Sequence, residues 1–561
     1  MAQHTHTFED FERKRRAVVP AEPTALIPVR PDRATGRRGR PVRAFGRRHR
    51  LPLLATVPTL PLYAVWWVFL ATGGGDLAAQ EAWAGFAARH GGSAYNLFWY
   101  GGMHTADYSL MSPYLMAVLG VRTVTVASGL AASWLAAVLI GRAGVRRPAG
   151  PALLASLALW CNVASGRTTF ALGVAFGLAA CVLLTGERRG PLAAGYAALA
   201  TAASPVAGLF LAVPGAAYLA ERDRVRACVL LLPPCAVVGA TTVLFPFTGE
   251  QLMPPARVWP PVLLGLAVAA LAPRGWRAAR WSGVVYAAGT VLTYLVASPV
   301  GTNVERFAEL FAPAVLLAAL LAVSRPKRLR RALLVAALVF SVAWVGKKTA
   351  DDLVVSTAVP AWAADTQGVI GALERLGADR GRVEAVPARN HREATVFAPH
   401  VNLARGWNRQ LDMERGRLFY DGTFSEASYR AWLDRWAVGY VVLSSGTPDG
   451  YARDEARLVR ERPAWLEPVW SDAHWRVFRV RDAVPLVSSP ASVLRSSGAD
   501  VEIRIPRPGP VTVRIAYSPW LRAEGGCLAK EGEFTRLTVS EPGEYRISSE
   551  YGPSPVRAPS C

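Results

Sequence analysis

A carboxylate directly follows the first long apolar run of this 561-residue chain. Asp76 comes after residues 51–72 and three glycines, and Glu81 lies five positions further on. At this border, near the depth of lipid headgroups, a carboxylate can take the proton from a hydroxyl group as that hydroxyl attacks the anomeric carbon of a sugar. We therefore take Asp76 and Glu81 as candidate catalytic residues of the polar segment 73–111.

Other polar side chains beside the apolar runs could hold an anionic substrate. His104 can donate a hydrogen bond to a phosphate, and Asp107 stands at the far end of the same segment. Arg167 and Arg306 border later apolar runs, and a guanidinium binds phosphate oxygens in pairs. Charges at the edge of a membrane span are costly, which favours a functional role for them.

Each of these residues also has a structural explanation. The aromatic residues of segment 73–111, among them Trp83 and Trp99, suit a membrane interface, so the segment could be an ordinary solvated loop. Glu305 could neutralise Arg306, whose long side chain could also reach the headgroups. The residues alone leave both interpretations open.

The candidate residues lie between long apolar segments. Hydrophobic residues make up 52% of the chain and charged residues only 19%. About 20 apolar residues suffice for a helix to cross a bilayer. The pattern predicts a polytopic α-helical membrane protein with about eleven transmembrane helices, at residues 51–72, 113–141, 150–165, 168–185, 191–203, 205–220, 227–247, 258–272, 282–298, 303–323 and 331–346.

The distribution of arginine predicts the orientation of these helices. The formal net charge is +22, and the basic residues concentrate in every second loop, at residues 142–147, 187–189, 221–226, 274–280 and 325–331. Basic loops face the cytoplasm in membrane proteins. This places the N-terminus inside the cell, and segment 73–111 and the chain after residue 346 outside. It also explains the positive charge without nucleic acid, which we exclude as a partner.

Outside the apolar runs, the chain divides into an arm and a soluble tail. Residues 1–50 are polar and rich in arginine, which predicts a disordered, basic cytoplasmic arm. Residues 347–482 predict an extracytoplasmic α/β domain and residues 483–561 a β-rich, sandwich-like domain. The expected helices lie at 366–376 and 427–436, and the expected strands at 383–386, 439–443, 475–480, 501–505 and 511–515.

Two stretches of the tail, residues 390–394 and 404–410, are dense in polar and aromatic side chains. Loops that contact carbohydrate often have this composition, and a surface that packs against the membrane part would explain it equally well. The sequence does not separate these two possibilities.

The cysteines and known motifs narrow the range of chemistry. Four of the six cysteines lie in or beside apolar runs, where they serve as small hydrophobic residues, and Cys527 and Cys561 could pair outside the cell. No CxxC or His/Cys cluster predicts a metal site. Walker A, GxSxG and HExxH sequences are also absent, so ATP-driven transport and triad hydrolysis have no support.

Several short motifs together resemble a known family. They are Gly75-Asp76-Leu77-Ala78-Ala79-Gln80, Asn96-Leu97-Phe98-Trp99-Tyr100-Gly101-Gly102, Tyr108, Ser112-Pro113-Tyr114, Trp475-Arg476-Val477-Phe478-Arg479-Val480 and Tyr517-Ser518-Pro519-Trp520. The first-loop pattern and the tail motifs resemble YfhO-like membrane proteins of the glycosyltransferase C (GT-C) superfamily.

The resemblance implies a polyprenyl-phosphate sugar as donor, with Asp76 as the catalytic base. The segment with Asn303 and Arg306 resembles an outer loop late in the membrane half of such proteins, which adds Asn303 to the candidate substrate-binding residues. YfhO-like chains tend to be longer, and the Asp-Asp or Glu-x-Asp pair typical of them is absent beside Asp76. This difference leaves a divalent metal and the catalytic partner open.

The resulting hypothesis is an integral-membrane glycosyltransferase of the cell membrane. It would transfer a sugar on the extracytoplasmic face to a cell-envelope glycan, lipid or protein, among membrane lipids. The alternative is a multi-span secondary transporter or lipid flippase, although such proteins usually carry internal repeats and charged residues within their spans. A non-catalytic scaffold for envelope assembly is a third possibility.

Overall fold

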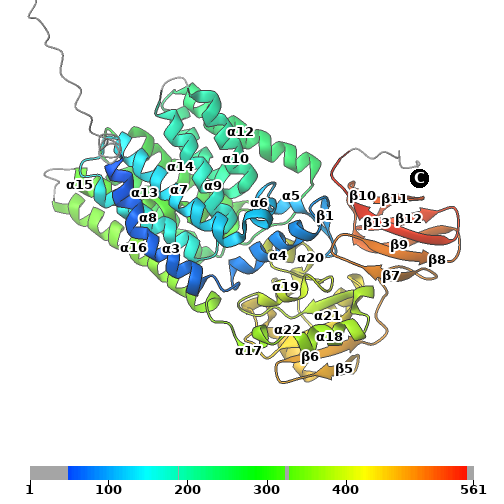
Figure 1. The fold of residues 1–561 in the computed structure, drawn as a ribbon. Coiled ribbons are helices and arrows are strands. Elements are labelled where there is room, and N and C mark those ends of the chain that lie inside the picture. Colours follow the sequence, from blue (N-terminus) through cyan, green and yellow to red (C-terminus); the bar gives the residue numbers. More distant parts are fainter. Residues whose placement is uncertain (1–48, 187–188, 323–327, 553–561) are drawn as a thin grey trace, which may run out of the picture. The chain divides into compact units, whose positions relative to one another are not determined.

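The computed structural model describes residues 49–186, 189–322 and 328–552. The predicted arm, apart from its last two residues, and Cys561 lie outside these ranges. The described residues belong to one compact unit, shown as a ribbon in Figure 1. We call residues 50–356 the helical part, residues 361–480 the α/β domain and residues 492–549 the β domain.

Each predicted apolar run forms helix. The first is a continuous helix, Arg50–Leu70, with a 3-10 turn and a π-helical turn inside it. The second divides at Gly120 into α6 and α7. The helices that follow Arg50–Leu70 are α6 (Ser112–Leu119), α7 (Val121–Arg142), α8 (Ala149–Ala164), α9 (Thr168–Leu184), α10 (Gly190–Ala203), α11 (Pro205–Ala220), α12 (Arg224–Leu244), α13 (Trp259–Leu271), α14 (Arg277–Leu295), α15 (Glu305–Ala322) and α16 (Arg328–Ser356).

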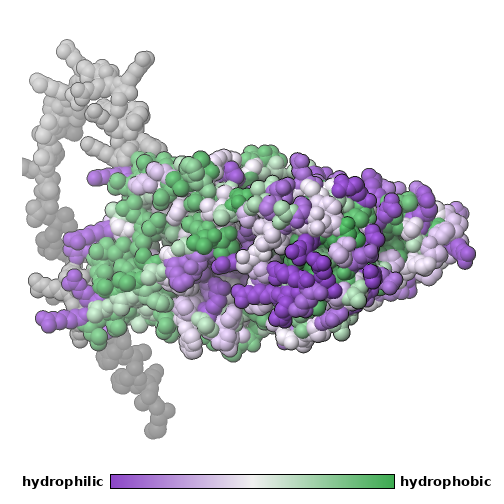
Figure 2. Space-filling view, turned by 90° about the horizontal axis from the view of Figure 1, so that it is seen from below, coloured by the Kyte–Doolittle hydropathy of each residue, from purple (hydrophilic) through white to green (hydrophobic). Residues whose placement is uncertain are grey.

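The length of the helices and the apolar surface of the helical part are both typical of a membrane protein. Four helices of the described chain are long and apolar enough to cross a membrane: Arg50–Leu70, Val121–Arg142, Arg224–Leu244 and Arg328–Ser356. Among described residues, the well-exposed large apolar side chains lie between residues 54 and 359, apart from Tyr451 and Tyr551. Hydrophobic surface of this extent is rare in soluble proteins, and Figure 2 shows it gathered over the helices.

The first polar segment, residues 73–111, is ordered structure and not an open loop. It contains helix α4 (Asp76–Arg89), a short hairpin of β1 (Tyr95–Asn96) and β2 (Met103–His104), and helix α5 (Thr105–Tyr108). Its aromatic residues are buried: Trp83 and Trp99 belong to a core that also contains residues of the α/β domain. The interface role that the sequence allowed for these two residues is therefore wrong.

The α/β domain is built on a four-stranded sheet in the order β3-β4-β6-β5. Strand β3 runs parallel to β4, and the other pairs are antiparallel. The strands are β3 (Arg382–Ala385), β4 (Val438–Ser444), β5 (Leu466–Ser471) and β6 (Trp475–Val480), and the helices are α17 (Ala361–Ala364), α18 (Gln367–Arg375), α19 (Arg392–Phe397), α20 (Arg409–Arg415), α21 (Glu426–Arg435) and α22 (Arg453–Glu461). The predicted helices and strands of this domain are confirmed within two residues.

The β domain consists of two antiparallel sheets, β10-β13-β8-β7 and β11-β12-β9. Their inward-facing residues, such as Val501, Ile503 and Ile505 of β8, alternate with more exposed ones and form a shared core. The strands are β7 (Ser492–Ser496), β8 (Val501–Ile505), β9 (Gly509–Ala516), β10 (Leu521–Ala523), β11 (Gly526–Glu531), β12 (Phe534–Val539) and β13 (Gly543–Ser549). The sandwich-like character predicted for the last part of the chain is present.

The boundary predicted at residue 347 falls inside a helix. Helix α16 continues without interruption from Arg328 to Ser356, so its last ten residues extend past the apolar run. These residues include Lys348 and Asp352, which lie one turn apart. The extension brings both side chains to the end of the helical part, where the candidate residues lie.

Candidate active site at one end of the helical part

Asp76 is the first residue of helix α4. Gly75, the residue before it, has φ 65° and ψ −139°, a conformation open to glycine and to few other residues. This sharp turn ends the first helical segment and starts α4 in a new direction. The carboxylate of Asp76 is 35% exposed and stands at a helix N-terminus, where negative charge is favoured.

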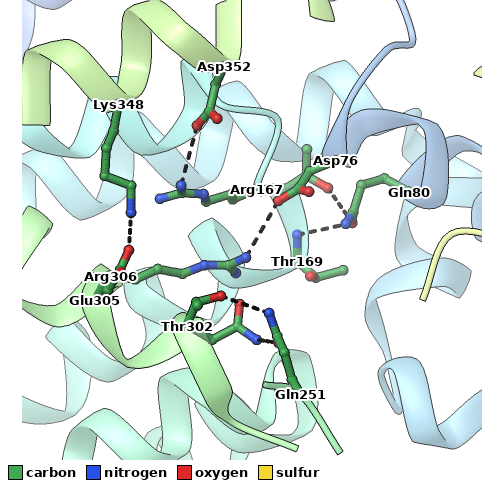
Figure 3. Close-up of polar contacts among 12 residues, drawn as sticks. Asp76, Gln80, Arg167, Thr169, Gln251, Thr302, Glu305, Arg306, Lys348 and Asp352 are labelled. Carbon is green, nitrogen blue, oxygen red and sulfur yellow. Dashed lines mark hydrogen bonds and ion pairs between the residues drawn. The ribbon is translucent and has the colours of Figure 1, made fainter. Parts of the chain in front are cut away.

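Arg306, in the first turn of α15, faces Asp76. One of its guanidinium nitrogens lies 3.5 Å from a carboxylate oxygen of Asp76 (Figure 3). The guanidinium carbon also lies 5.4 Å from the ring centre of Phe170. The long contact with Asp76 leaves several of the five guanidinium donors available to a further anion.

Arg167, which precedes α9, is held by two carboxylates. Its guanidinium donates to Glu309 at 2.5 Å and to Asp352 at 3.3 Å. Lys348 contacts Glu309 as well, and also Glu305. Arg167 is therefore a partner in a nearly buried ion network, more firmly fixed than Arg306.

The network continues to the surface through Glu305. Arg257 donates two hydrogen bonds to its carboxylate, at 2.8 and 2.7 Å. The sequence allowed Glu305 to neutralise its neighbour Arg306, but in the structure Glu305 binds Arg257 and Lys348. Arg306 thus keeps its positive charge directed toward Asp76.

Glu81 lies on the same helix as Asp76 but has a different environment. Its carboxyl group comes near Gly73, and it interacts with Arg122 and Arg392 at longer range. Burial raises the pKa of Glu81 above its ordinary value, and the two arginines only partly oppose this effect. No described contact joins Glu81 to Arg306.

His104 and Asp107 lie at the β domain. The Nε2 atom of His104 is 2.8 Å from the hydroxyl oxygen of Ser518, and its Nδ1 atom is 3.2 Å from the carboxylate of Asp107. His104 and Ser518 are buried, and both side-chain nitrogens of His104 have partners. Burial raises the pKa of Asp107 despite its contact with His104. The described contacts do not bring this pair to Asp76.

Asn303 supports the loop before α15. Its side-chain amide donates to Gln251 at 2.7 Å, and Gln251 donates to Thr302 at 2.8 Å. Gln410 of the α/β domain binds the same loop through the carbonyl oxygen of Pro299, at 2.9 Å. Asn303 is thus tied into a loop that connects two parts of the chain and positions the start of α15.

An apolar cavity of about 290 Å³ lies between α9, α11, α13, α14 and α15. Phe210 and Phe307 are among the residues that line it. Phe210 packs against Phe170, with ring centres 5.5 Å apart, and Phe170 lies beneath the guanidinium of Arg306. A chain of contacts therefore leads from the charged end of the helical part to the cavity.

The α/β domain is fastened to the end of the helical part beside Asp76. Arg392, at the start of α19, donates to the hydroxyl oxygen of Thr72 at 2.8 Å and to the carbonyl oxygen of Ser356 at 2.7 Å. It also contacts the carbonyl oxygen of Thr72. One arginine thereby joins the end of the first helical segment, the end of α16 and the α/β domain.

Four residues that complete this cluster are not among those predicted from the sequence: Glu309, Lys348, Asp352 and Arg392. For Glu309 a signal existed, because it is an acid four positions after Glu305 inside an apolar run. Helical residues at this spacing share a face. Lys348 and Asp352 have the same spacing, but they lie beyond the apolar run, in the part of the chain that the sequence predicts to be the tail. Among described residues, no group of three or more His, Cys, Asp or Glu side chains is arranged to hold a metal ion.

These features define a helical membrane protein with two C-terminal domains and a charged cluster at one end of its helices. Residues 488–561 match a family described as a domain of unknown function (DUF8823). No protein of curated function matches the sequence.

Solved structures similar to the chain include cryo-EM structures of the arabinofuranosyltransferase AftD from mycobacteria and of a mutant of it. Sequence identity is 13% for both, and the TM-scores are 0.42 and 0.41. The matches cover 90% and 89% of this chain but only 57% and 60% of the AftD chains, so this chain spans less than two thirds of their length.

Proposed function

We propose that this protein is an integral-membrane glycosyltransferase that uses a polyprenyl-phosphate sugar, with a GT-C-like and YfhO-like organisation. The observation that carries the proposal is the 3.5 Å approach of the Asp76 carboxylate and the Arg306 guanidinium. A group that accepts a proton and a group that binds phosphate thus stand together at the end of a membrane helix bundle.

In the proposed reaction, the acceptor hydroxyl oxygen forms a bond to the anomeric carbon of the donor sugar. The bond between that carbon and the phosphate oxygen breaks, and the electron pair leaves with the polyprenyl phosphate. The hydroxyl proton passes to Asp76. Arg306 stabilises the negative charge that develops on the phosphate, an effect that grows where water is excluded. Arg167 is already paired with Glu309 and Asp352, so its proposed role is to hold the start of α9 in place beside Arg306.

The apolar cavity suits the lipid part of such a donor. It is lined by apolar side chains and lies next to Phe307, the residue after Arg306. A prenyl chain in it would be removed from water while its phosphate stayed at Arg306. The acceptor, a cell-envelope glycan, lipid or protein, would approach from the side of the α/β domain.

The proposed orientation follows from the arginine-rich loops. It places Asp76, Arg306 and the two C-terminal domains outside the cell and the N-terminus inside. A transporter would need charged groups along a path between its helices. Here Arg167 precedes α9, and Glu305 and Arg306 begin α15, so the charges favour chemistry at the membrane surface.

The test is sugar transfer by the purified protein in lipid nanodiscs. Radiolabelled farnesyl-phosphoryl pentoses and hexoses serve as donors, and cell-envelope extract serves as acceptor. Asp76→Asn should lower transfer by about 10³-fold, as loss of a catalytic proton acceptor does. Folding, judged by size-exclusion profile and thermal unfolding, should not change.

Asp351→Asn is the matched control. Asp351 is also a carboxylate near the end of the helical part, but it is exposed and pairs with Lys347 on the surface of α16. This variant should keep full transfer. Transfer that survives in Asp76→Asn at the wild-type rate would refute the proposed function.

A further inference from the structure

Two neighbouring loops of the α/β domain follow parallel strands. Strands β3 and β4 are parallel, and the segments after their carboxyl ends pair with each other. The amide of Asp449 donates to the carbonyl oxygen of Pro387 at 2.8 Å, and the amide of Arg389 donates to that of Thr447 at 2.9 Å. In open α/β sheets, ligands bind at the carboxyl ends of the strands.

Polar and aromatic side chains converge at this edge. The ring of His391 stacks on that of Trp407, with centres 3.5 Å apart, and its Nε2 atom lies 3.5 Å from Asp449. Arg409 donates to the carboxylate of Asp449 at 2.8 Å. The guanidinium of Arg409 also lies 5.1 Å from the ring centre of Tyr451. We call these five residues the loop cluster.

Tyr451 forms the accessible side of the loop cluster. Its side chain is 45% exposed, and within residues 360–550, all of them described, the other large apolar side chains are more buried than this. Arg409 beside it is also partly exposed. An exposed aromatic ring next to charged hydrogen-bonding groups is an arrangement that holds a polar ligand with an apolar face.

Buried polar atoms at the inner side of the cluster are unpaired. Glu393, two residues after His391 in the sequence, is almost fully buried. Its Oε2 atom has no hydrogen-bond partner among the described residues. The Nδ1 atom of His391 also lacks one, since the closest oxygen of Glu393 is 3.6 Å away. Unsatisfied buried polar groups are rare and indicate a missing partner such as a ligand or water.

The structure separates the two roles that the sequence left open for residues 390–394 and 404–410. Asn390, Arg392 and Gln410 bind the helical part through Gly75, Thr72 and Pro299. His391, Trp407 and Arg409 do not take part in those contacts and instead face one another in the loop cluster. Contact with the helical part therefore explains only some of the polar and aromatic residues in 390–394 and 404–410.

We propose that the loop cluster is a saccharide-binding subsite. A sugar ring would stack on Tyr451, while Arg409 and Asp449 would hydrogen bond to its hydroxyl groups. Asn390, one residue before His391, touches Gly75 beside Asp76. If the protein is a glycosyltransferase as proposed above, this subsite would hold the acceptor glycan at a distance from the reacting hydroxyl.

The test measures binding of soluble neutral oligosaccharides of pentoses and hexoses to the intact protein in nanodiscs, by isothermal titration calorimetry and saturation-transfer NMR. Tyr451→Ala should weaken binding by about three- to tenfold, the range expected from loss of one aromatic contact. Tyr451→Phe keeps the ring and should bind as the wild type does. Arg409→Gln should weaken binding as well.

Binding of none of the oligosaccharides by the wild type, or equal binding by Tyr451→Ala and the wild type, would overturn the subsite. The variant Asp76→Asn distinguishes failure of the subsite from failure of the proposed function, because Asp76 lies outside the loop cluster. If Asp76→Asn still transfers sugar while binding depends on Tyr451, the subsite stands and the catalytic proposal fails. If binding is absent while Asp76→Asn abolishes transfer, the subsite alone fails.

Discussion

The backbone amide of Gly75 donates a 2.8 Å hydrogen bond to the carbonyl oxygen of Asn390. This bond joins the residue before Asp76 to the loop that follows β3 of the α/β domain. The position of the Asp76 carboxylate therefore depends on contacts made more than three hundred residues later in the chain. The C-terminal part supports the candidate active site as well as flanking it.

The conformation of Gly75 leads to the first prediction. With φ 65° and ψ −139°, Gly75→Ala should cost about 1–3 kcal/mol or shift the backbone. An added Cβ would also lie 3.1 Å from the Cβ of Ser356. Because Asp76 is the next residue, transfer should fall more than stability does, which paired assays of transfer and thermal unfolding can measure.

Gly85→Ala is the control for this change. Gly85 lies inside α4, where alanine is favoured over glycine, and an added Cβ would meet only the flexible end of Arg89. This variant should be as stable as the wild type or more so, with normal transfer. Equal losses in the two variants would show that the turn at Gly75 has no special importance.

Arg392 provides the second prediction, on the joint between domains. Its guanidinium binds Thr72, Ser356 and Ala358 at once. Hydrogen bonds to charged groups contribute about 1.5–3 kcal/mol each, so Arg392→Gln should loosen the joint without unfolding either side. Limited proteolysis should then cut faster within residues 357–366, and transfer should fall.

Arg389→Gln is a matched change three residues earlier. The side chain of Arg389 is exposed, and the backbone amide of this residue donates to the carbonyl oxygen of Thr447. Proteolysis and transfer should therefore stay at wild-type levels. An Arg392→Gln variant that resists protease as well as Arg389→Gln does would contradict the assigned role.

Local patterns made much of the fold predictable. In the tail, alternation at Val501–Ile505 and the continuous apolar run within Val438–Ser444 correspond to a half-buried and a buried strand. The alternation of arginine-rich loops predicts that Asp76 and Arg306 lie on the same side of the membrane, and the structure brings their side chains to 3.5 Å of each other. Helix α4 was not expected, although an acid at its start and its many alanines are typical of helices.

Contacts between distant segments could not be predicted in the same way. His104 was expected to bind phosphate, but its Nε2 atom contacts Ser518, which lies 414 residues away in sequence. Nothing in the spacing of a single chain records such a partner. The partners of Arg167 likewise come from α15 and α16, so its place in an ion network appears only when three helices pack together.

The third prediction separates Arg306 from Arg167. Arg306→Lys keeps the charge but loses the planar fork of donors, so transfer should fall by about 10²-fold with little change in stability. Arg167→Gln leaves the buried carboxylate of Glu309 with Lys348 as its remaining cation, and loss of a hydrogen bond to a charged group costs about 1.5–3 kcal/mol. It should lower the unfolding temperature clearly.

Thermal unfolding and transfer in nanodiscs measure both effects on the same samples. The expected result is a loss of activity for one variant and a loss of stability for the other. If Arg306→Lys unfolds as early as Arg167→Gln, Arg306 is a structural member of the ion network. The proposal that it binds the donor phosphate would then lose its support.

The fourth prediction concerns pH and the loop cluster. Burial by itself lowers the pKa of His391, but the carboxylates of Asp449 and Glu393 outweigh this effect and raise it above the ordinary value, against the opposing charge of Arg409. Burial raises the pKa of Asp449, yet His391 and Arg409 together hold it well below the ordinary value. The two groups therefore attract each other most when both are charged.

The sign of each shift determines where this attraction stabilises the fold. A histidine with a raised pKa contributes its full stabilisation of the folded state below about pH 6.5. This stabilisation is lost as pH rises through the raised pKa. A carboxylate with a lowered pKa contributes above about pH 4 and loses its contribution as pH falls toward the lowered value. The loops after β3 and β4 should consequently be held together most firmly between about pH 4 and pH 6.5.

Hydrogen exchange of the backbone amides in residues 387–391 and 447–451 measures this directly. After correction for the intrinsic rate, exchange should speed up as pH rises through the raised pKa of His391, because the neutral imidazole no longer attracts Asp449 and Glu393. In His391→Gln the same amides should exchange faster at pH 6 and respond little to further increase. If the exchange rates of these amides depend on pH in the same way in the wild type and in His391→Gln, the pairing of His391 with Asp449 does not hold these loops.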